Sequence, residues 1–336
     1  MRGATIGDEA GDGTLSFTTQ ELSGARKFNA FLGLLPRYHV DRRWNARCVQ
    51  TMTKAAQSLV PDGPIRRGEA VSRVVVANGR EIGLRLIVPK GIRHGLYVHF
   101  HGGAWVMGNA RLDDGITRPI ARRCQTLVAA VDFHNAIDDR LDVTVHDCRT
   151  AVDWLVDHLP ELQVKRIILG GESSGAHLAA EALLHLRQRG KAEFVAGFIS
   201  MCGGFDLTGS ESLRQSTGRS LVIDGPSALR NLQRLTPSLS GRQARGPRFA
   251  DLSSLPPALF IAGALDPIID DSLSMSLHWQ QQNGNADCAV FPEAPHGFNR
   301  FPTKLAAKAN GLVRAWISRR LETIWISPGG LGGQSR

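Results

Sequence analysis

The feature that most constrains the fold is a repeated order of strand, loop and helix that begins after Pro89. Short apolar runs alternate with longer segments of helical periodicity, which is typical of a parallel sheet with crossover helices. The expected buried strands cover residues 96–100, 127–131, 167–169, 194–201, 258–262 and 288–291. The expected helices cover about 143–159, 174–189, 270–282 and 303–321.

Two segments before Pro89 have the character of β-strands. Residues 71–76 and 82–88 are separated by a short connection containing Asn78-Gly79, a strong signal for a hairpin turn. The second segment alternates strictly between apolar and other residues, which suits an antiparallel edge of the sheet. With the six buried runs, we therefore expect a mostly parallel eight-stranded sheet flanked by helices.

Two further regions lie outside the core pattern. The first contains two helical patterns: one opens on the capping-box residues Thr18 and Glu21 and ends at Pro36, and the other runs toward Val60. The run from 203 to 255 is too long for an ordinary connection and is rich in Gly, Ser, Pro and Arg. We interpret both as parts of a helical cap.

The expected organisation is one α/β core interrupted by cap segments. Residues 1–60 form an N-terminal helical cap portion, 61–202 the first part of the core, and 203–255 an inserted cap segment. Residues 256–327 form the second part of the core, and the Gly-rich residues 328–336 a flexible tail.

The composition excludes several classes of protein. The net charge is +9, but the basic residues are dispersed, so we expect solvated faces and no nucleic-acid partner. No segment has the roughly 18 consecutive apolar residues of a membrane span, and the N-terminus lacks a basic region followed by an apolar run, so a cytoplasmic location is expected. A homodimer is compatible with the sequence.

The cysteines give no sign of a metal or redox site. They are five in number, widely scattered and without a C-x-x-C pair, and we interpret them as buried free thiols. They are Cys48, Cys124, Cys148, Cys202 and Cys288.

The motif Gly171-Glu172-Ser173-Ser174-Gly175 lies between an expected strand and an expected helix. A sharp turn in that position can expose a serine hydroxyl as a nucleophile, and its glycines permit a strained backbone. The five residues alone are weak evidence, because a Gly/Ser-rich turn between strand and helix is an alternative reading. The flanking strand and helix favour the nucleophile.

A glycine-rich loop follows the first buried strand. In His101-Gly102-Gly103-Ala104-Trp105, small residues would let backbone N–H groups approach a carbonyl oxygen and stabilise a tetrahedral intermediate. An ordinary glycine turn is the alternative. We expect His99, in the strand, and His101, in the loop, to be structural.

An acid and a histidine follow the last two strands. A serine hydroxyl needs a base to remove its proton and an acid to orient that base. Asp266 follows the strand at 258–262, and His296 lies in the loop after the strand at 288–291. Asp270 and Asp271 lie where a helix N-terminus would favour carboxylates, so we expect capping there and choose Asp266 as the acid.

Together these motifs resemble the hormone-sensitive-lipase branch of the α/β hydrolases, over nearly the whole chain up to Phe298. The residues that carry the resemblance are 101–105, 171–175, 251–258, Leu265-Asp266-Pro267 and His296-Gly297-Phe298. The resemblance implies an α/β-hydrolase fold with a helical cap and a triad of Ser173, Asp266 and His296.

The resemblance also implies oxyanion donors from the glycine loop and from Ser174, which would act through backbone N–H groups of Gly102, Gly103, Ala104 and Ser174. Three residues depart from the family pattern: Ala104 replaces its third glycine, Glu172 its aspartate and Ser174 its alanine. Backbone donors survive these changes. The segment 131–138 also departs from the family's usual sequence, so a different wall or support for the site is expected.

The function expected from these residues is serine carboxylic-ester hydrolysis of short- to medium-chain acyl esters through an acyl-enzyme intermediate. The partner is a small-molecule ester, and the chemistry needs no metal or organic cofactor. An amide hydrolase of the arylformamidase type is an alternative, because the same triad cleaves either bond. A non-catalytic ligand receptor on the same fold is a second alternative, which the presence of His296 disfavours.

Overall fold

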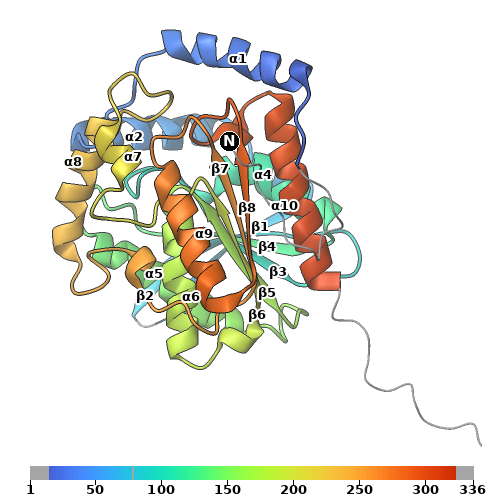
Figure 1. Cartoon of the computed structure of the whole chain (residues 1–336). Helices are drawn as coiled ribbons and strands as arrows, with labels where there is room; N and C mark the ends of the chain where they lie inside the picture. The colour runs from blue at the N-terminus through green and yellow to red at the C-terminus, as the bar shows by residue number, and fades with distance from the viewer. Residues whose placement is uncertain (1–14, 78, 323–336) are drawn as a thin grey trace, which may run out of the picture.

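A computed structural model describes residues 15–77 and 79–322. Its strands form one eight-stranded sheet in the order β1-β2-β4-β3-β5-β6-β7-β8 (Figure 1). β2 pairs antiparallel with both β1 and β4, and every other neighbouring pair is parallel. The strands are β1 (Ala70–Ala77), β2 (Arg80–Ile87), β3 (Leu96–Phe100), β4 (Leu127–Asp132), β5 (Ile167–Glu172), β6 (Val195–Met201), β7 (Ala258–Gly263) and β8 (Ala286–Phe291). The mostly parallel sheet predicted from the sequence is confirmed.

Helices cover both faces of the sheet. Buried residues of α5, α6 and α9 belong to the core on one face, and those of α4 and α10 to the core on the other. The helices are α1 (Thr19–Leu34), α2 (Arg43–Leu59), α3 (Gly63–Arg66), α4 (Asp114–Arg123), α5 (Leu141–Asp157), α6 (Ser174–Gln188), α7 (Glu211–Gln215), α8 (Gly225–Leu235), α9 (Ile269–Asn283) and α10 (Lys304–Glu322). The sequence analysis missed α4, which contains Pro119.

The central strands explain the apolar runs in the sequence. Every residue of β3, β5, β6 and β7 is buried, since helices cover both of their faces. Parallel strands of this kind bring their carboxyl ends to one edge of the sheet. The loops that follow β3, β5, β7 and β8, which hold the predicted site residues, therefore meet there.

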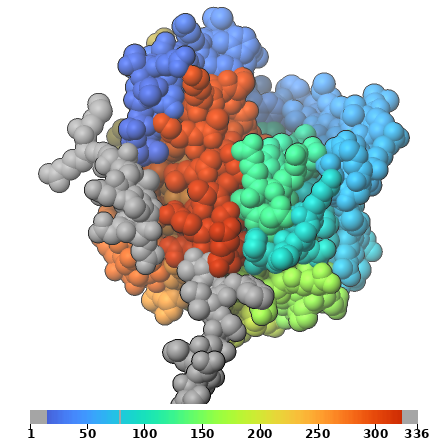
Figure 2. Space-filling model, turned by 90° about the vertical axis from the view of Figure 1, so that its right-hand side faces the viewer, coloured from blue at the N-terminus to red at the C-terminus, as the bar shows by residue number. Residues whose placement is uncertain are grey.

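The N-terminal helices attach to segments far along the chain. The capping box of α1 is present: the Thr18 hydroxyl accepts from the Glu21 N–H, and the Glu21 carboxylate accepts from the Thr18 N–H. Farther along α1, Arg26 and Asn29 donate to the side chain and carbonyl of Glu293, at 2.9 and 2.8 Å. Figure 2 shows α1 lying over the end of the C-terminal segment that includes α10.

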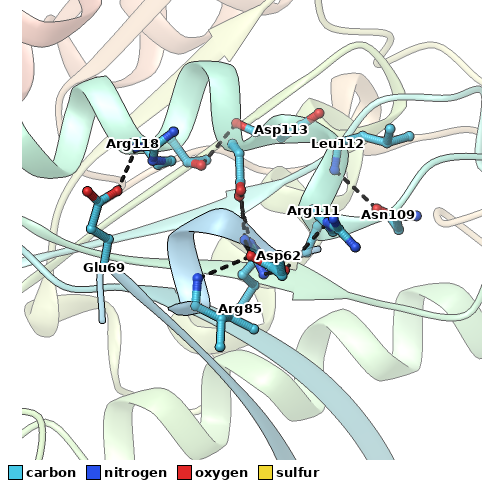
Figure 3. A network of polar contacts seen from close by, with 12 residues as sticks. Asp62, Glu69, Arg85, Asn109, Arg111, Leu112, Asp113 and Arg118 are labelled. Atoms are coloured by element: carbon cyan, nitrogen blue, oxygen red, sulfur yellow. Dashed lines mark hydrogen bonds and ion pairs between the residues drawn. The ribbon is translucent and has the colours of Figure 1, made fainter. Parts of the chain in front are cut away.

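A buried arginine joins β2 to α4 and to the segment that follows α2. Arg85 in β2 donates twice to Asp62, at 2.8 and 2.9 Å, and twice to Asp114, at 2.6 and 2.7 Å. Asp62 also accepts from the backbone N–H of Ile65 and so caps α3 (Figure 3). The guanidinium thus holds the linker after α2 against the first turn of α4.

Two other expectations concern the cysteines and the membrane. Cys124, Cys148 and Cys202 are buried, but Cys288 is half-buried and Cys48 is exposed, so the expectation of buried thiols is wrong for Cys48.

No helix in residues 15–77 and 79–322 is long and apolar enough to span a membrane. The predicted flexible tail, 328–336, lies outside the described residues, as does Asn78 of the predicted hairpin turn.

Replacing Arg85 should destabilise the fold strongly. Arg85→Ala would leave the carboxylates of Asp62 and Asp114 partly buried without their main cation, and we expect the free energy of unfolding to fall by about 3 kcal/mol. Arg140→Ala is the control, because Arg140 pairs with Asp142 on the surface, where such a pair contributes about 0–1 kcal/mol. Urea denaturation measures both; equal effects would contradict the role given to Arg85.

Candidate active site

Ser173 lies at a sharp turn between β5 and α6. Its backbone has φ 55° and ψ −122°, a conformation that costs free energy for a residue with a side chain. Gly175, two residues on, packs so closely that a Cβ there would lie 2.0 Å from the carbonyl oxygen of Phe100. Only glycine allows the start of α6 to lie this close to the end of β3.

The predicted serine, histidine and acid lie within hydrogen-bonding distance of one another. The distance from Ser173 Oγ to His296 Nε2 is 2.8 Å, and that from His296 Nδ1 to Asp266 Oδ2 is 2.8 Å. Asp266 and His296 are both buried. Asp266 follows β7 and His296 follows β8, so the parallel sheet brings together three residues that are far apart in the sequence.

The surroundings of His296 favour its protonated form. Burial opposes a charge on the imidazole, but the charge and hydrogen bond of Asp266, together with the charge of Glu172, outweigh it and raise the pKa of His296 above its ordinary value. Because its pKa is raised, His296 accepts a proton readily from the Ser173 hydroxyl.

The glycine-rich loop lies against the serine turn. A Cβ on Gly102 would lie 3.5 Å from the Cβ of Ser173. Gly103 has φ +127°, and a Cβ there would lie 2.0 Å from the carbonyl oxygen of Met107, so no other residue fits. Ala104 has φ 52°, in the left-handed region that favours glycine.

The predicted oxyanion donors form no hydrogen bond to other groups in the described part of the chain. Within residues 15–77 and 79–322, the backbone N–H groups of Gly102, Gly103, Ala104 and Ser174 donate to no protein atom. Ser174 is the first residue of α6, and the N-terminus of a helix favours negative charge. These N–H groups are therefore available to a substrate oxygen.

Three contacts support the loop from outside. The carbonyl of Ala104 accepts from the Asn231 side chain of α8 at 3.1 Å, and the carbonyl of Trp105 accepts from the N–H of Ala136 at 2.7 Å. The Trp105 indole donates to Nδ1 of His177 at 3.2 Å. Because burial lowers the pKa of His177 to about 4, this imidazole is neutral near pH 7 and can accept the bond.

The segment that departs from the family pattern has a role in this support. Ala136 belongs to it, and Phe133 stacks on the ring of His101 with 4.1 Å between centroids. His101 also bonds the carbonyl of Gly102 through Nδ1 at 2.8 Å. The segment 131–138 thus lies behind the glycine loop and holds it in place.

A network of charges, in which the carboxylates are buried and Arg300 is partly exposed, connects the serine turn to the histidine loop. Glu172 accepts from Asn299 at 2.9 Å and from Arg300 at 2.5 Å, and Arg300 also donates to Asp113 at 2.8 Å. Asp113 bonds His99 at 2.6 Å. Burial disfavours both charged forms, but the hydrogen bond of His99, with the charges of His99 and Arg300, holds the pKa of Asp113 below its ordinary value. The charges of Glu172 and Asp113 hold the pKa of Arg300 above its ordinary value. The sequence analysis missed Asp113, Asn299 and Arg300.

The expectation of helix capping by Asp270 and Asp271 needs correction. Both residues lie in the first turn of α9, but the helix has no side-chain cap bond. Asp271 instead accepts from the N–H groups of Phe205 and Asp206, at 2.6 and 2.7 Å, and Asp270 accepts from that of Ser212 at 2.8 Å. They hold the inserted segment to the core, and burial raises the pKa of Asp271 to about 7.

A cavity of about 410 Å³ opens over Ser173 and His296. Its walls come from the loops after the strands and from the segments 15–60 and 203–255, and most of the side chains that these two segments contribute are apolar. Those that line it include Val40, Val49, Thr53, Leu213, Ala228 and Leu232.

One group of side chains could hold a metal ion. Ligand atoms of Cys202, Asp266 and His296 lie within 4.8 Å of one another. Asp266 and His296 are hydrogen-bonded to each other, and His296 is also hydrogen-bonded to Ser173. Burial raises the pKa of the Cys202 thiol well above its ordinary value. The group therefore fits a hydrogen-bonded acid and base better than a metal centre.

Comparison with known proteins gives consistent results. A family model of the alpha/beta hydrolase fold matches residues 97–300. An arylesterase of Saccharolobus solfataricus is 29% identical over 66% of this chain and 73% of its own length, and an esterase of Acinetobacter venetianus is 31% identical over 53% of this chain and 58% of its own.

Solved structures resemble the fold. A bacterial heroin esterase has a TM-score of 0.76 and 24% identity over 90% of this chain and 97% of its own. An esterase of Pyrobaculum calidifontis has a TM-score of 0.74 and 23% identity, covering 87% of this chain and 97% of its own. Because the family model covers more than half of the chain, the chain belongs to the α/β-hydrolase family. Within it, the match supports the hormone-sensitive-lipase-like branch that the sequence motifs resemble.

The raised pKa of His296 sets the pH dependence of any reaction that uses it as a base. Activity should fall as the pH falls through this pKa. In a plot of kcat/KM against pH, the midpoint of the acidic limb should therefore lie at a higher pH than the pKa of about 6.5 of a free imidazole. Asp266→Asn should lower kcat by about 10⁴-fold and shift the limb to lower pH. An unmoved limb would contradict the influence of Asp266 on His296.

Asp271 should make stability depend on pH. Its pKa is about 7 in the folded protein and about 3.9 in an unfolded chain, so its stabilising contribution is complete below pH 4 and is lost as the pH rises through 7. Asp271→Asn keeps an oxygen acceptor without the titration. Relative to wild type, this variant should gain free energy of unfolding between pH 5 and pH 8, because wild type loses the contribution of the protonated Asp271 over that range. A constant difference across that range would contradict the assignment.

Proposed function

We propose that this protein is a serine carboxylic-ester hydrolase that acts on short- to medium-chain acyl esters. The observation that carries the proposal is the hydrogen-bonded series Ser173, His296 and Asp266 at the base of a largely apolar cavity. The names of the related arylesterase and esterase support ester hydrolysis as the reaction. We further propose that residues 1–60 and 203–255 form the cap, since side chains from both line the cavity.

In the first half of the proposed reaction, Ser173 Oγ attacks the ester carbonyl carbon while His296 Nε2 takes its proton. Asp266 stabilises the imidazolium that forms. The carbonyl oxygen becomes an oxyanion, which accepts hydrogen bonds from backbone N–H groups among Gly102, Gly103, Ala104 and Ser174. When the carbonyl re-forms, the C–O bond to the alcohol breaks, and His296 gives its proton to the leaving oxygen.

In the second half, water replaces the alcohol. His296 removes a proton from the water as its oxygen attacks the acyl carbon, and the same N–H groups stabilise the second oxyanion. Collapse of this intermediate breaks the bond to Ser173 Oγ, which recovers its proton from His296. The products are one carboxylic acid and one alcohol, and the protein returns to its starting state.

The cavity supports the substrate class. Its apolar cap residues would bury an acyl or aromatic group, while the polar groups gather near Ser173. A volume of about 410 Å³ suits a small ester better than a long-chain lipid. The intact bond between His296 and Ser173 disfavours the alternative of a non-catalytic receptor.

Ser173→Ala should abolish hydrolysis of p-nitrophenyl acetate and butyrate without loss of the fold. Removal of the nucleophile should cost about 10⁶-fold in kcat, and labelling by a fluorophosphonate probe should disappear with it. Ser174→Ala is the matched control, because its proposed contribution is a backbone N–H, and it should retain most activity. Turnover of the esters by Ser173→Ala at the wild-type rate would overturn the proposal, and faster cleavage of matched formamides by wild type would favour the amide hydrolase.

A further inference from the structure

Helix α2 has three faces of different character. A straight helix turns by about 100° per residue, so residues four apart fall on one side. One side faces the core and the cavity: Ala46 is buried, and Val49 and Thr53 line the cavity. The other two sides are exposed, one apolar and one basic. α2 lies at the same end of the molecule as α7 and α8 (Figure 1).

The exposed apolar face, here called the α2 stripe, consists of Trp44, Cys48, Met52, Ala55 and Leu59. The exposed fractions of Trp44, Met52 and Leu59 are 62%, 71% and 83%. Large apolar residues scattered singly on a surface are ordinary, but here they follow one side of a helix along its whole length. Contact with water along this stripe is unfavourable, so a partner that covers it would be stabilised.

The basic face lies beside the stripe. Arg47 and Lys54 are exposed and form no ion pair with any residue in the described part of the chain. Arg43, on the same side, pairs with Asp139. α2 contains no acidic residue. An apolar stripe bordered by unneutralised cations is the pattern of a helix that lies in the surface of an anionic membrane.

The inner face of α2 is held firmly to the core. The Gln50 side chain donates to the carbonyl of Gly108 and accepts from its N–H, each at 3.0 Å. Gln57 and Asn109 exchange two side-chain hydrogen bonds, at 3.0 and 3.2 Å. Arg111 donates to the carbonyl of Gln57 in the last turn of α2 and to that of Val60, the C-cap residue. The exposed stripe is therefore presented on a fixed helix.

We propose that α2 docks this protein onto an anionic lipid surface, with the α2 stripe in the interfacial layer and Arg47 and Lys54 against lipid phosphates. A second copy of the chain fits less well, because two such helices face to face would bring unpaired cations together with no acidic residue on either helix. The proposal goes beyond ester hydrolysis and does not depend on it.

Sedimentation with vesicles tests the proposal directly. Vesicles of phosphatidylcholine alone are compared with vesicles of equal parts phosphatidylcholine and phosphatidylglycerol, with the full-length protein at low salt. We expect the protein to sediment with the anionic vesicles and to be released by salt. Met52→Glu/Leu59→Glu should weaken this partitioning at least about tenfold, since burial of each large apolar side chain contributes severalfold or more.

Matched variants separate the two faces of the helix. Arg47→Gln/Lys54→Gln should weaken partitioning about 25-fold, at about fivefold for each cation near the surface. Ile92→Glu is the control: Ile92 is 78% exposed, but it precedes β3 and so lies toward the opposite end of the strands from the cavity. It should partition like wild type. Circular dichroism of each variant checks the fold.

A dye at Cys48 gives a second readout of docking. Cys48 is the exposed cysteine within the stripe, whereas the other four are buried or half-buried. An environment-sensitive dye there should shift to shorter wavelength with anionic vesicles only. Equal sedimentation with both kinds of vesicle, or wild-type partitioning by Met52→Glu/Leu59→Glu, would overturn the proposal. So would a dimer in analytical ultracentrifugation that this double variant dissociates, together with no binding to vesicles.

Discussion

The close contact between the end of β3 and the start of α6 is the constraint on which the site depends. Because Gly175 lies against the carbonyl of Phe100, the serine turn and the glycine loop cannot separate without opening the sheet itself. The strained backbone at Ser173 is then maintained by the packing of two central elements. The position of the proposed oxyanion donors relative to the Ser173 hydroxyl is thus set by the sheet, and the flanking loops have little freedom to change it.

The charges around Glu172 extend this rigidity to the histidine. Glu172 comes directly before the serine, while Asn299 and Arg300 come shortly after His296, so their hydrogen bonds join the two loops side by side. Burial of a carboxylate such as Glu172 carries a large desolvation cost, which is offset only while it keeps its partners. The network therefore favours one arrangement of the loops over neighbouring arrangements that would leave a charge unpaired.

Much of the fold and of the candidate site could be predicted from the sequence, for physical reasons that differ between elements. The buried parallel strands are short runs of apolar residues, and the order of Ser173, Asp266 and His296 follows from successive strands of one sheet. Helix α4 was missed because Pro119 lies inside it and disrupts the helical pattern. Asp271 was misread because its position in the first turn of a helix is local information, whereas its partners at Phe205 and Asp206 are set by the folded inserted segment. Arg300 carried no local signal, because its role depends on Asp113, which lies far away in the sequence.

The attachment of α1 has a consequence for synthesis of the chain. The ion pairs of α1 join Arg26 to Glu293 and Glu21 to Lys308, and because Arg26 and Glu293 are 267 positions apart, the partners are synthesised long after the helix. Until then α1 has no docking surface, because β8 and α10 do not exist. The nascent chain therefore carries α1 without these partners until β8 and α10 have been synthesised, and the docking of α1 has to follow the synthesis of those elements.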